Sequence, residues 1–264
     1  MISRLSVLKL GGSVLRDGRS YAEAARFLQT RLTLNQDERL VVIVSAPFGT
    51  TDCLQAEAQT ITDAPARTAL DLLWSTGELR SVALLALHLQ KIGVSSVPFN
   101  VHQTGLVADP SGDTSVRPGQ LLAALAHARV VIVPGFLGVS AGGAIASLGR
   151  GGSDLTAVLL ASAIRADACE LIKDVAGYYT GDPRHDPGAR QIHELSIAAA
   201  IRMADGGCDL VQRAALVAAS NAGLRIIVRS MDADAPVTPV YGNERTADHG
   251  IRDEDNPRGT TLGA

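Results

Sequence analysis

The sequence of 264 residues predicts an α/β fold in which a mostly parallel sheet is covered by helices on both faces. Short β-branched segments alternate with segments of helical periodicity, which is the order of elements in such folds. Several of the β-branched segments are apolar throughout rather than alternating, as is typical of strands buried on both faces. The expected strands are 5–10, 40–46, 94–99, 130–134, 169–174 and 224–228.

Helical patterns lie between and after these strands. We expect helices near 20–33, 68–91, 117–128, 153–165, 194–204 and 209–222. Two segments rich in turn-forming residues, 111–119 and 182–191, are predicted to be surface loops. Neither a repeat nor a linker interrupts the order, so the prediction is a single domain over residues 1–264.

Composition favours a small-molecule ligand over a macromolecular one. The 24 basic and 27 acidic residues give a net charge of −3 with no basic run, so we expect no nucleic-acid partner and no membrane partner. Cys53, Cys169 and Cys208 lie far apart and form no CxxC pair, which indicates neither a disulfide framework nor a zinc site. With no signal peptide or membrane-spanning segment evident, a cytoplasmic location is expected.

Ligands of open α/β sheets bind at the carboxyl ends of the strands. Four loops in such positions carry unusual residues and are expected to converge: KLGGSV at 9–14, SAPFGTTD at 45–52, GRGGSD at 149–154 and KDVAGYYTGDPR at 173–184.

In the first loop, Lys9 is followed by two glycines. This arrangement lets a phosphate approach the backbone while Lys9 supplies a positive charge. An ordinary strand-to-helix turn also uses two glycines, but a lysine that ends a buried strand needs a partner.

In the third loop, Arg150 lies among Gly149, Gly151 and Gly152. Its forked donors fit a carboxylate or a phosphate, and the helix that follows presents free N–H groups to an anion. An N-cap role for Ser153 or Asp154 would explain those two residues but not the arginine.

The remaining candidates have two readings each. Glu78, at the start of a long helical pattern, is either a partner of the helix dipole or a ligand for an ammonium group. Ser45, Thr50 and Thr51 either cap the next helix or line a site. Tyr178 and Tyr179 suggest a flat ligand such as a base or ribose, or else one of them packs over a turn.

Taken together, these motifs resemble the amino acid kinase family, and most closely the catalytic domain of aspartokinases. KLGGSV resembles KFGGTSV, VVIVSAPFGTTDCL resembles VVVVSAxxGxTxxL, and GELRSVALLA resembles GExxSxxLLA. LGRGGSDLTAVLLA is similar to LGRGGSDxTAxxLA, and KDVAGYYTGDPR to TDVDGVYTADPR. GTTL near the end is similar to the close of that domain. The resemblance implies a three-layer α/β/α sandwich.

The implied activity is transfer of the γ-phosphate of ATP to a carboxylate such as the side chain of aspartate, in amino-acid biosynthesis. The implied catalytic residues are Lys9 and Asp154. The implied amino-acid ligands are Ser45, Thr51, Glu78, Arg150, Ser153 and Asp154. The implied nucleotide ligands are Lys9, Gly11, Gly12, Ser13, Asp174, Tyr179 and Arg184. Mg²⁺ would arrive with ATP, so no dedicated metal cage is expected. A homodimer is expected from the resemblance and from the frequency of such dimers.

Two departures from the family pattern leave alternatives open. GCDLVQR stands where aspartokinases read GAKVLHP, which puts Asp209 at the position of a nucleotide-contacting lysine. Another cation such as Arg213 compensates, or the nucleotide sits differently, or catalysis has been lost. The chain also stops where the catalytic domain stops, so regulatory ACT domains are expected to be absent. The alternatives are a kinase of another small acid or phosphorylated metabolite, or an impaired nucleotide- or ligand-binding protein.

Overall fold

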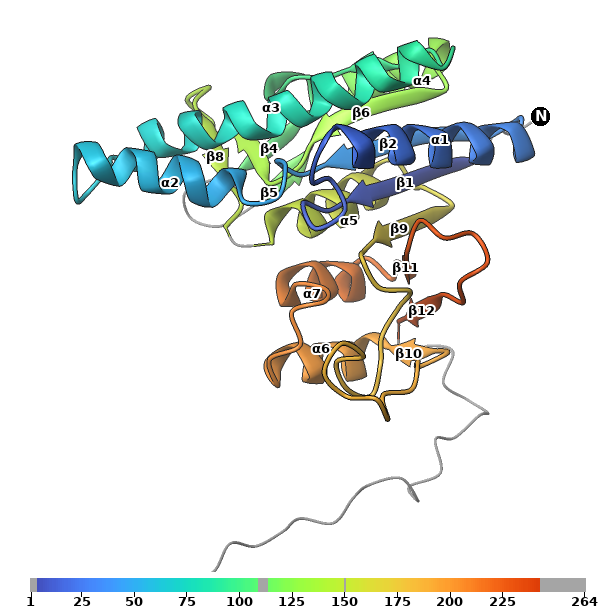
Figure 1. Ribbon diagram of the computed structural model, residues 1–264. Helices are drawn as coiled ribbons and strands as arrows, with labels where there is room; N and C mark the ends of the chain where they lie inside the picture. The colour runs from blue at the N-terminus through green and yellow to red at the C-terminus, as the bar shows by residue number, and fades with distance from the viewer. Residues whose placement is uncertain (1–3, 109–113, 150, 243–264) are drawn as a thin grey trace, which may run out of the picture.

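The computed structural model describes residues 4–108, 114–149 and 151–242 (Figure 1). An eight-stranded sheet runs through the molecule in the order β10-β12-β11-β9-β1-β2-β6-β3, and every neighbouring pair is parallel except β11 with β12. Its strands are β1 (Leu5–Leu10), β2 (Arg39–Val44), β3 (Val97–Pro98), β6 (Val130–Pro134), β9 (Ala168–Ile172), β10 (Leu195–Ser196), β11 (Ile226–Arg229) and β12 (Thr238–Tyr241).

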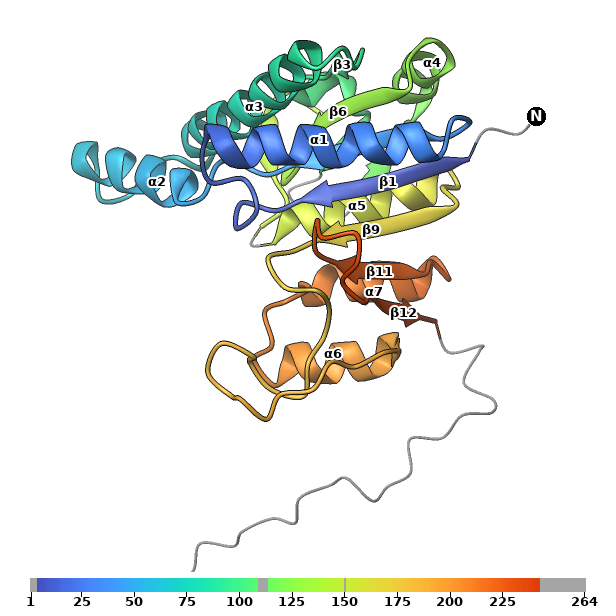
Figure 2. The ribbon, with the colours of Figure 1, turned by 45° about the vertical axis from the view of Figure 1, so that its right-hand side comes forward.

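Helices cover both faces of this sheet, which confirms the predicted fold class (Figure 2). The helices are α1 (Gly18–Leu34), α2 (Thr50–Ile61), α3 (Arg67–Lys91), α4 (Gly119–His127), α5 (Gly152–Ala163), α6 (Ile197–Asp205) and α7 (Arg213–Asn221), with a 3₁₀ turn η1 (Val101–Gln103). None of the helices in the described part of the chain has the length and apolarity needed to cross a bilayer.

Two hydrophobic cores make the three layers. On one face α1 and α3 pack against alternate strand residues such as Leu8 and Leu10. On the other face α4, α5, α6 and α7 pack against the intervening residues, including Val7 and Leu171. Because successive strand side chains point to opposite faces, continuously apolar strands supply both cores at once.

A second, four-stranded sheet was not predicted. It has the order β5-β4-β7-β8 and consists of β4 (Leu106–Ala108), β5 (Thr114–Val116), β7 (Leu137–Val139) and β8 (Ile145–Ser147). Each strand is three residues long, which is too short for an alternating pattern to be read from sequence. This sheet packs beside α3 and α5. The predicted loop 111–119 is therefore wrong in part, since β5 and the start of α4 fall within it.

The helix α2 was missed as well. It buries only Ala58, and Leu54 and Ile61 are its only large aliphatic residues. Its N-cap is Gly49, in the left-handed conformation with φ 75°, and no side chain caps it. Capping by Ser45, Thr50 or Thr51 is therefore wrong.

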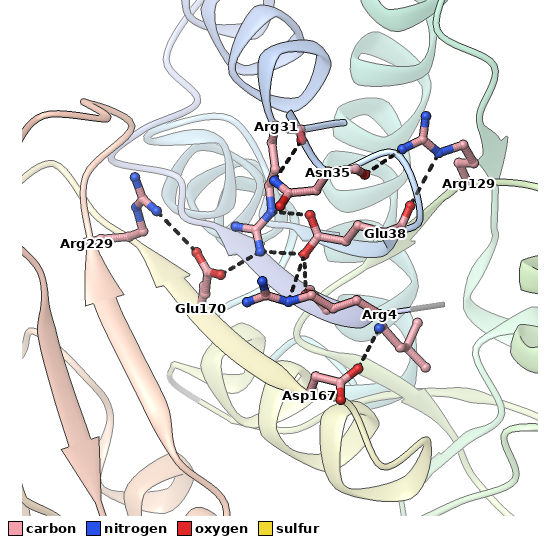
Figure 3. A network of polar contacts seen from close by, with 10 residues as sticks. Arg4, Arg31, Asn35, Glu38, Arg129, Asp167, Glu170 and Arg229 are labelled. Carbon is pink, nitrogen blue, oxygen red and sulfur yellow. Dashed lines mark hydrogen bonds and ion pairs between the residues drawn. The ribbon is translucent and has the colours of Figure 1, made fainter. Parts of the chain in front are cut away.

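A network of buried charges lies beneath the end of α1, toward the amino ends of β1 and β2 (Figure 3). The guanidinium of Arg31 contacts Glu38 at 2.8 Å and Glu170 at 2.7 Å. Arg4 and Arg229 each approach one of these two carboxylates at 3.6 Å. Although burial raises the pKa of Glu38, Arg31 and the Ser6 hydroxyl outweigh it and hold that pKa below its usual value. This network binds the last turn of α1 to the sheet.

Candidate active site

The site lies where the strand order reverses. On one side β1 pairs with β2, the next strand of this sheet in the chain, and on the other side it pairs with β9, which comes much later. The loops that follow β1 and β9 therefore start at neighbouring strand ends and diverge from there. This is the position at which open α/β sheets bind ligands.

Strand alternation places two lysines together at this point. Val7 on β1 and Leu171 on β9 both belong to the core that faces α5. Two residues further along each strand, Lys9 and Lys173 continue the same face. Both ammonium groups therefore reach the amino end of α5.

The two lysines share one carboxylate. Lys9 Nζ lies 2.8 Å from Asp154 Oδ1, and Lys173 Nζ lies 2.9 Å from Asp154 Oδ2. The side chains of Lys9, Lys173 and Asp154 are exposed by only 9%, 10% and 3%. The partner expected for Lys9 is therefore Asp154.

Electrostatics keep Asp154 and Lys173 ionised at neutral pH. Burial alone would raise the pKa of Asp154, but Lys173 and Lys9 hold it well below its usual range. Burial, with repulsion from Lys9, lowers the pKa of Lys173 to about 8, although Asp154 opposes this shift. Within this trio, two cations therefore share one anion.

The glycine-rich loop lets α5 begin against the site. Gly151 is the N-cap with φ 70°, and a Cβ on it would lie 1.7 Å from Gln212 Cγ, so only glycine fits. Ser153 and Asp154 are thus in the first turn of α5, and the expected N-cap role for either is wrong. A carboxylate in the first turn is stabilised by the helix dipole. Arg150 lies outside the described residues.

The predicted amino-acid ligands come together around one cavity of about 840 Å³. Its lining includes these residues predicted from sequence: Lys9, Gly12, Ser13, Ser45, Thr51, Glu78, Ser153 and Asp154. They come from β1, the loop after β2, α2, α3 and α5. Gly11 does not line the cavity; a Cβ at this residue would lie 3.1 Å from Lys9 Nζ.

Glu78 is a buried carboxyl group in this cavity, and one of its oxygens lacks a partner within the described part of the chain. It lies in the interior of α3, eleven residues beyond Arg67, so the reading as a first-turn dipole partner is wrong. The residue is 3% exposed, and its Oε2 has no hydrogen-bond partner among the described residues. Burial raises its pKa to about 8, against a backbone hydrogen bond from Ala46 and the charge of Lys9. A cationic ligand would restore its ionised form.

Four of the seven predicted nucleotide ligands line a second cavity of about 710 Å³, whereas Lys9 and Gly12 line only the larger one. Asp174, Tyr179 and Arg184 meet there, together with Ser13. Arg184 Nε is held 3.1 Å from Asp182 Oδ1, within the predicted loop 182–191, which is irregular as expected. Tyr178, by contrast, is 1% exposed in the core, so of its two readings the packed position is confirmed and the contact with a flat ligand is wrong.

The two cavities meet at three shared residues: Ser13, Lys173 and Asp209. Sequence reasoning quoted Lys173 within a motif but gave it no role. The signal was available, since a lysine directly after an apolar strand was already the argument for Lys9. The aromatic wall of Trp74 and Phe136, whose ring centroids are 5.7 Å apart, was also missed.

Across the described ranges of the chain, no group of three or more His, Cys, Asp or Glu side chains is placed to hold a metal ion. The polar groups at the junction are one ammonium group, a serine hydroxyl and one aspartate carboxylate.

A switch-point site with converging lysines, a glycine-rich helix start and two joined cavities defines an anion-binding α/β protein of the kind that handles phosphates. Comparison with known proteins gives the particular family. The model of the amino acid kinase family matches residues 4–230, and the chain belongs to this family.

Aspartokinases are among its relatives. The chain is 37% identical to an aspartokinase of Mycobacterium bovis over 246 residues, which cover 90% of the chain and 58% of that relative. It is 37% identical to an aspartate kinase of Pseudomonas putida over 212 residues, 79% of the chain and 51% of that relative. The chain therefore spans little more than half the length of these curated relatives.

Solved structures agree. An aspartate kinase from Synechocystis matches with a TM-score of 0.79 and 34% identity, over 92% of this chain and 40% of that one. Aspartokinase III of E. coli, solved in complex with aspartate and ADP, matches with a TM-score of 0.78 and 26% identity, over 90% of this chain and 65% of that one.

Proposed function

We propose that this chain transfers the γ-phosphoryl group of ATP to the side-chain carboxylate of aspartate or a closely related small amino acid. The aspartokinases among its relatives support the reaction class. The observation that carries the proposal is the pair of cavities joined at Lys173 and Ser13, one of which holds the buried carboxyl group of Glu78, whose Oε2 has no partner among the described residues. Such a pair suits two ligands that must meet end to end.

In this proposal the amino acid occupies the larger cavity. Glu78 binds its α-ammonium group, and Arg150 binds its α-carboxylate with two parallel hydrogen bonds. Ser45, Thr51 and Ser153 supply the polar lining. Asp154 holds both lysine ammonium groups in position rather than contacting the reacting carboxylate.

ATP occupies the smaller cavity. Asp174, Tyr179 and Arg184 hold the nucleoside end, and the Gly11 to Ser13 turn admits the phosphates beside Lys9. Mg²⁺, delivered with ATP, would be held by phosphate oxygens and water, with few protein ligands.

Reaction requires positioning and charge neutralisation. A carboxylate oxygen forms a bond to the γ-phosphorus while the bond from that phosphorus to the bridging oxygen breaks, and its electron pair leaves with ADP. The acceptor is ionised at neutral pH, so no general base is needed. Lys9 neutralises the charge that spreads over the phosphoryl oxygens.

The test is a coupled assay of ADP release with a panel of acidic amino acids, with hydroxylamine present to trap an acyl phosphate as its hydroxamate. We expect ADP and hydroxamate in equal amounts with aspartate or a near analogue. ATP binding with no hydroxamate from any acid would contradict the proposal.

That second outcome would favour a nucleotide-binding protein without turnover. Asp209 motivates this alternative, because it places a negative charge at the junction of the two cavities. A kinase for another small acid is separated by extending the panel to acids without an α-ammonium group, from which it would give hydroxamate.

We further propose a homodimer in the cytoplasm, supported by the frequency of two-fold dimers among soluble oligomers and by the absence of paired cysteines in the sequence. Light scattering on the purified chain tests the dimer.

A further inference from the structure

Lysine is rare in this chain, and its placement is uneven. Of 24 basic residues only three are lysines: Lys9, Lys91 and Lys173. Lys91 is exposed at the end of α3, whereas the other two contact the same carboxylate. One aspartate can neutralise only one of them. Within the trio one positive charge is therefore left over, and an anionic ligand can pair with it.

Lys173 is the lysine at the junction. Lys9 lines only the larger of the two cavities, whereas Lys173 lines both. It follows β9 directly, next to β1 at the strand-order reversal. Its ammonium has three donors. Both of its hydrogen bonds go to Asp154, at 2.9 and 3.2 Å.

Two positions at this junction differ from the resembled motifs in opposite directions. Lys173 stands where TDVDGVYTADPR has threonine, and Asp209 stands where GAKVLHP has lysine. Both residues line both cavities. Relative to the resembled motifs, the junction lacks a lysine at position 209 and has one at position 173, so the number of lysines there is unchanged.

We propose that Lys173 is a catalytic residue of this chain that binds the terminal phosphate of the nucleotide, in place of the cation that the resembled motif carries at position 209. The proposal rests on the proposed function for its reaction, but its binding claim concerns the nucleotide phosphates alone. Lys9 and Lys173 contact the transferring group from two neighbouring strand ends, and Asp154 fixes their separation.

The test measures binding of AMP-PNP with Mg²⁺, and of adenosine, to the whole chain and to Lys173→Met, Lys173→Arg and Lys91→Met. Lys173→Met should weaken AMP-PNP binding by at least about tenfold because a buried phosphate loses a charge-assisted hydrogen bond. Adenosine affinity should stay within about twofold, because the nucleoside end does not reach Lys173. Lys91→Met, the matched control, should change neither.

Moving the lysine from position 173 to position 209 distinguishes a loss of catalysis from a loss of folding. Lys173→Thr should lower kcat by at least about a hundredfold, and adding Asp209→Lys should recover at least about tenfold of that loss. Unchanged AMP-PNP affinity in Lys173→Met, or no recovery in the double variant, would overturn the inference. If the parent chain binds AMP-PNP but phosphorylates no acid, the proposed function fails while the binding comparison still decides the role of Lys173.

Discussion

Two clusters of buried charge lie on opposite faces of the sheet, and they are built differently. Beneath α1, the fork of Arg31 contacts both Glu38 and Glu170 (Figure 3). At the strand ends facing α5, two lysines contact the single carboxylate of Asp154. The residues of the first cluster line neither cavity of the candidate site, whereas the residues of the second do.

The difference follows from the side chains used. A guanidinium presents five donors in a rigid plane and can satisfy two acids at once, which suits a permanent structural contact. An ammonium is a point charge on a flexible stem, which can serve a carboxylate and a ligand together. In a chain with three lysines, the placement of two of them at one aspartate therefore marks the site.

Replacing Lys9 should produce the largest effect on kcat. A small effect would mean that the cluster at Asp154 does not serve the reaction. Lys9→Met leaves Asp154 paired with Lys173, so folding should persist. The loss of a cation facing the transferring phosphate should lower kcat by about a thousandfold. Steady-state kinetics and thermal melting check this; a kcat within tenfold of the parent chain would remove Lys9 from the reaction.

Replacing Arg31 should have the opposite profile. Arg31→Met leaves Glu38 and Glu170 without their shared partner, which should cost about 3–5 kcal/mol of unfolding free energy. The kcat of the folded fraction should not change. Urea titration measures the loss. The control is Arg19→Met, whose exposed pair with Glu23 should contribute less than about 1 kcal/mol. Equal losses in both variants would mean that the buried network does not stabilise the fold.

Glu78 differs from both clusters, because it is a buried acid that forms no ion pair with any of the described residues. Its folded pKa of about 8 lies above the model-compound value of 4.5, so the folded chain binds more protons between these values. Stability should therefore fall as pH rises through this window.

Glu78→Gln should remove that slope and raise KM for the amino acid by about tenfold or more, with a smaller effect on KM for ATP. Urea titrations between pH 5 and 8 and steady-state kinetics check both parts. An unaltered slope, or equal effects on the two KM values, would contradict the ammonium-binding role.

The sequence anticipated the central architecture because it depends on local patterns. Continuous apolar strands predicted a sheet buried on both faces, and the strands at 5–10 and 130–134 have the bounds expected. The four-stranded sheet was not predicted because three-residue strands are too short to show an alternating pattern, and α2 was not predicted because it has few large aliphatic residues and buries only Ala58.

Sequence identified a site residue where a charged residue occurs at the end of an otherwise apolar strand. Lys9, ending an apolar strand, was found by that criterion, and Lys173 meets it equally. What sequence could not supply is the spatial relation of the two, because their joint contact with Asp154 depends on strand order, which brings β9 beside β1. Tyr178 is buried in the core, whereas its neighbour Tyr179 lines the smaller cavity, and this difference likewise depends on tertiary packing.

The most direct test of the account is a crystal structure of the chain with Mg²⁺, AMP-PNP and aspartate. The account predicts that the terminal phosphate contacts the ammonium groups of Lys9 and Lys173 and that the amino group of aspartate contacts Glu78. A nucleotide bound with its phosphates away from both lysines, or an amino acid bound without Glu78, would contradict it.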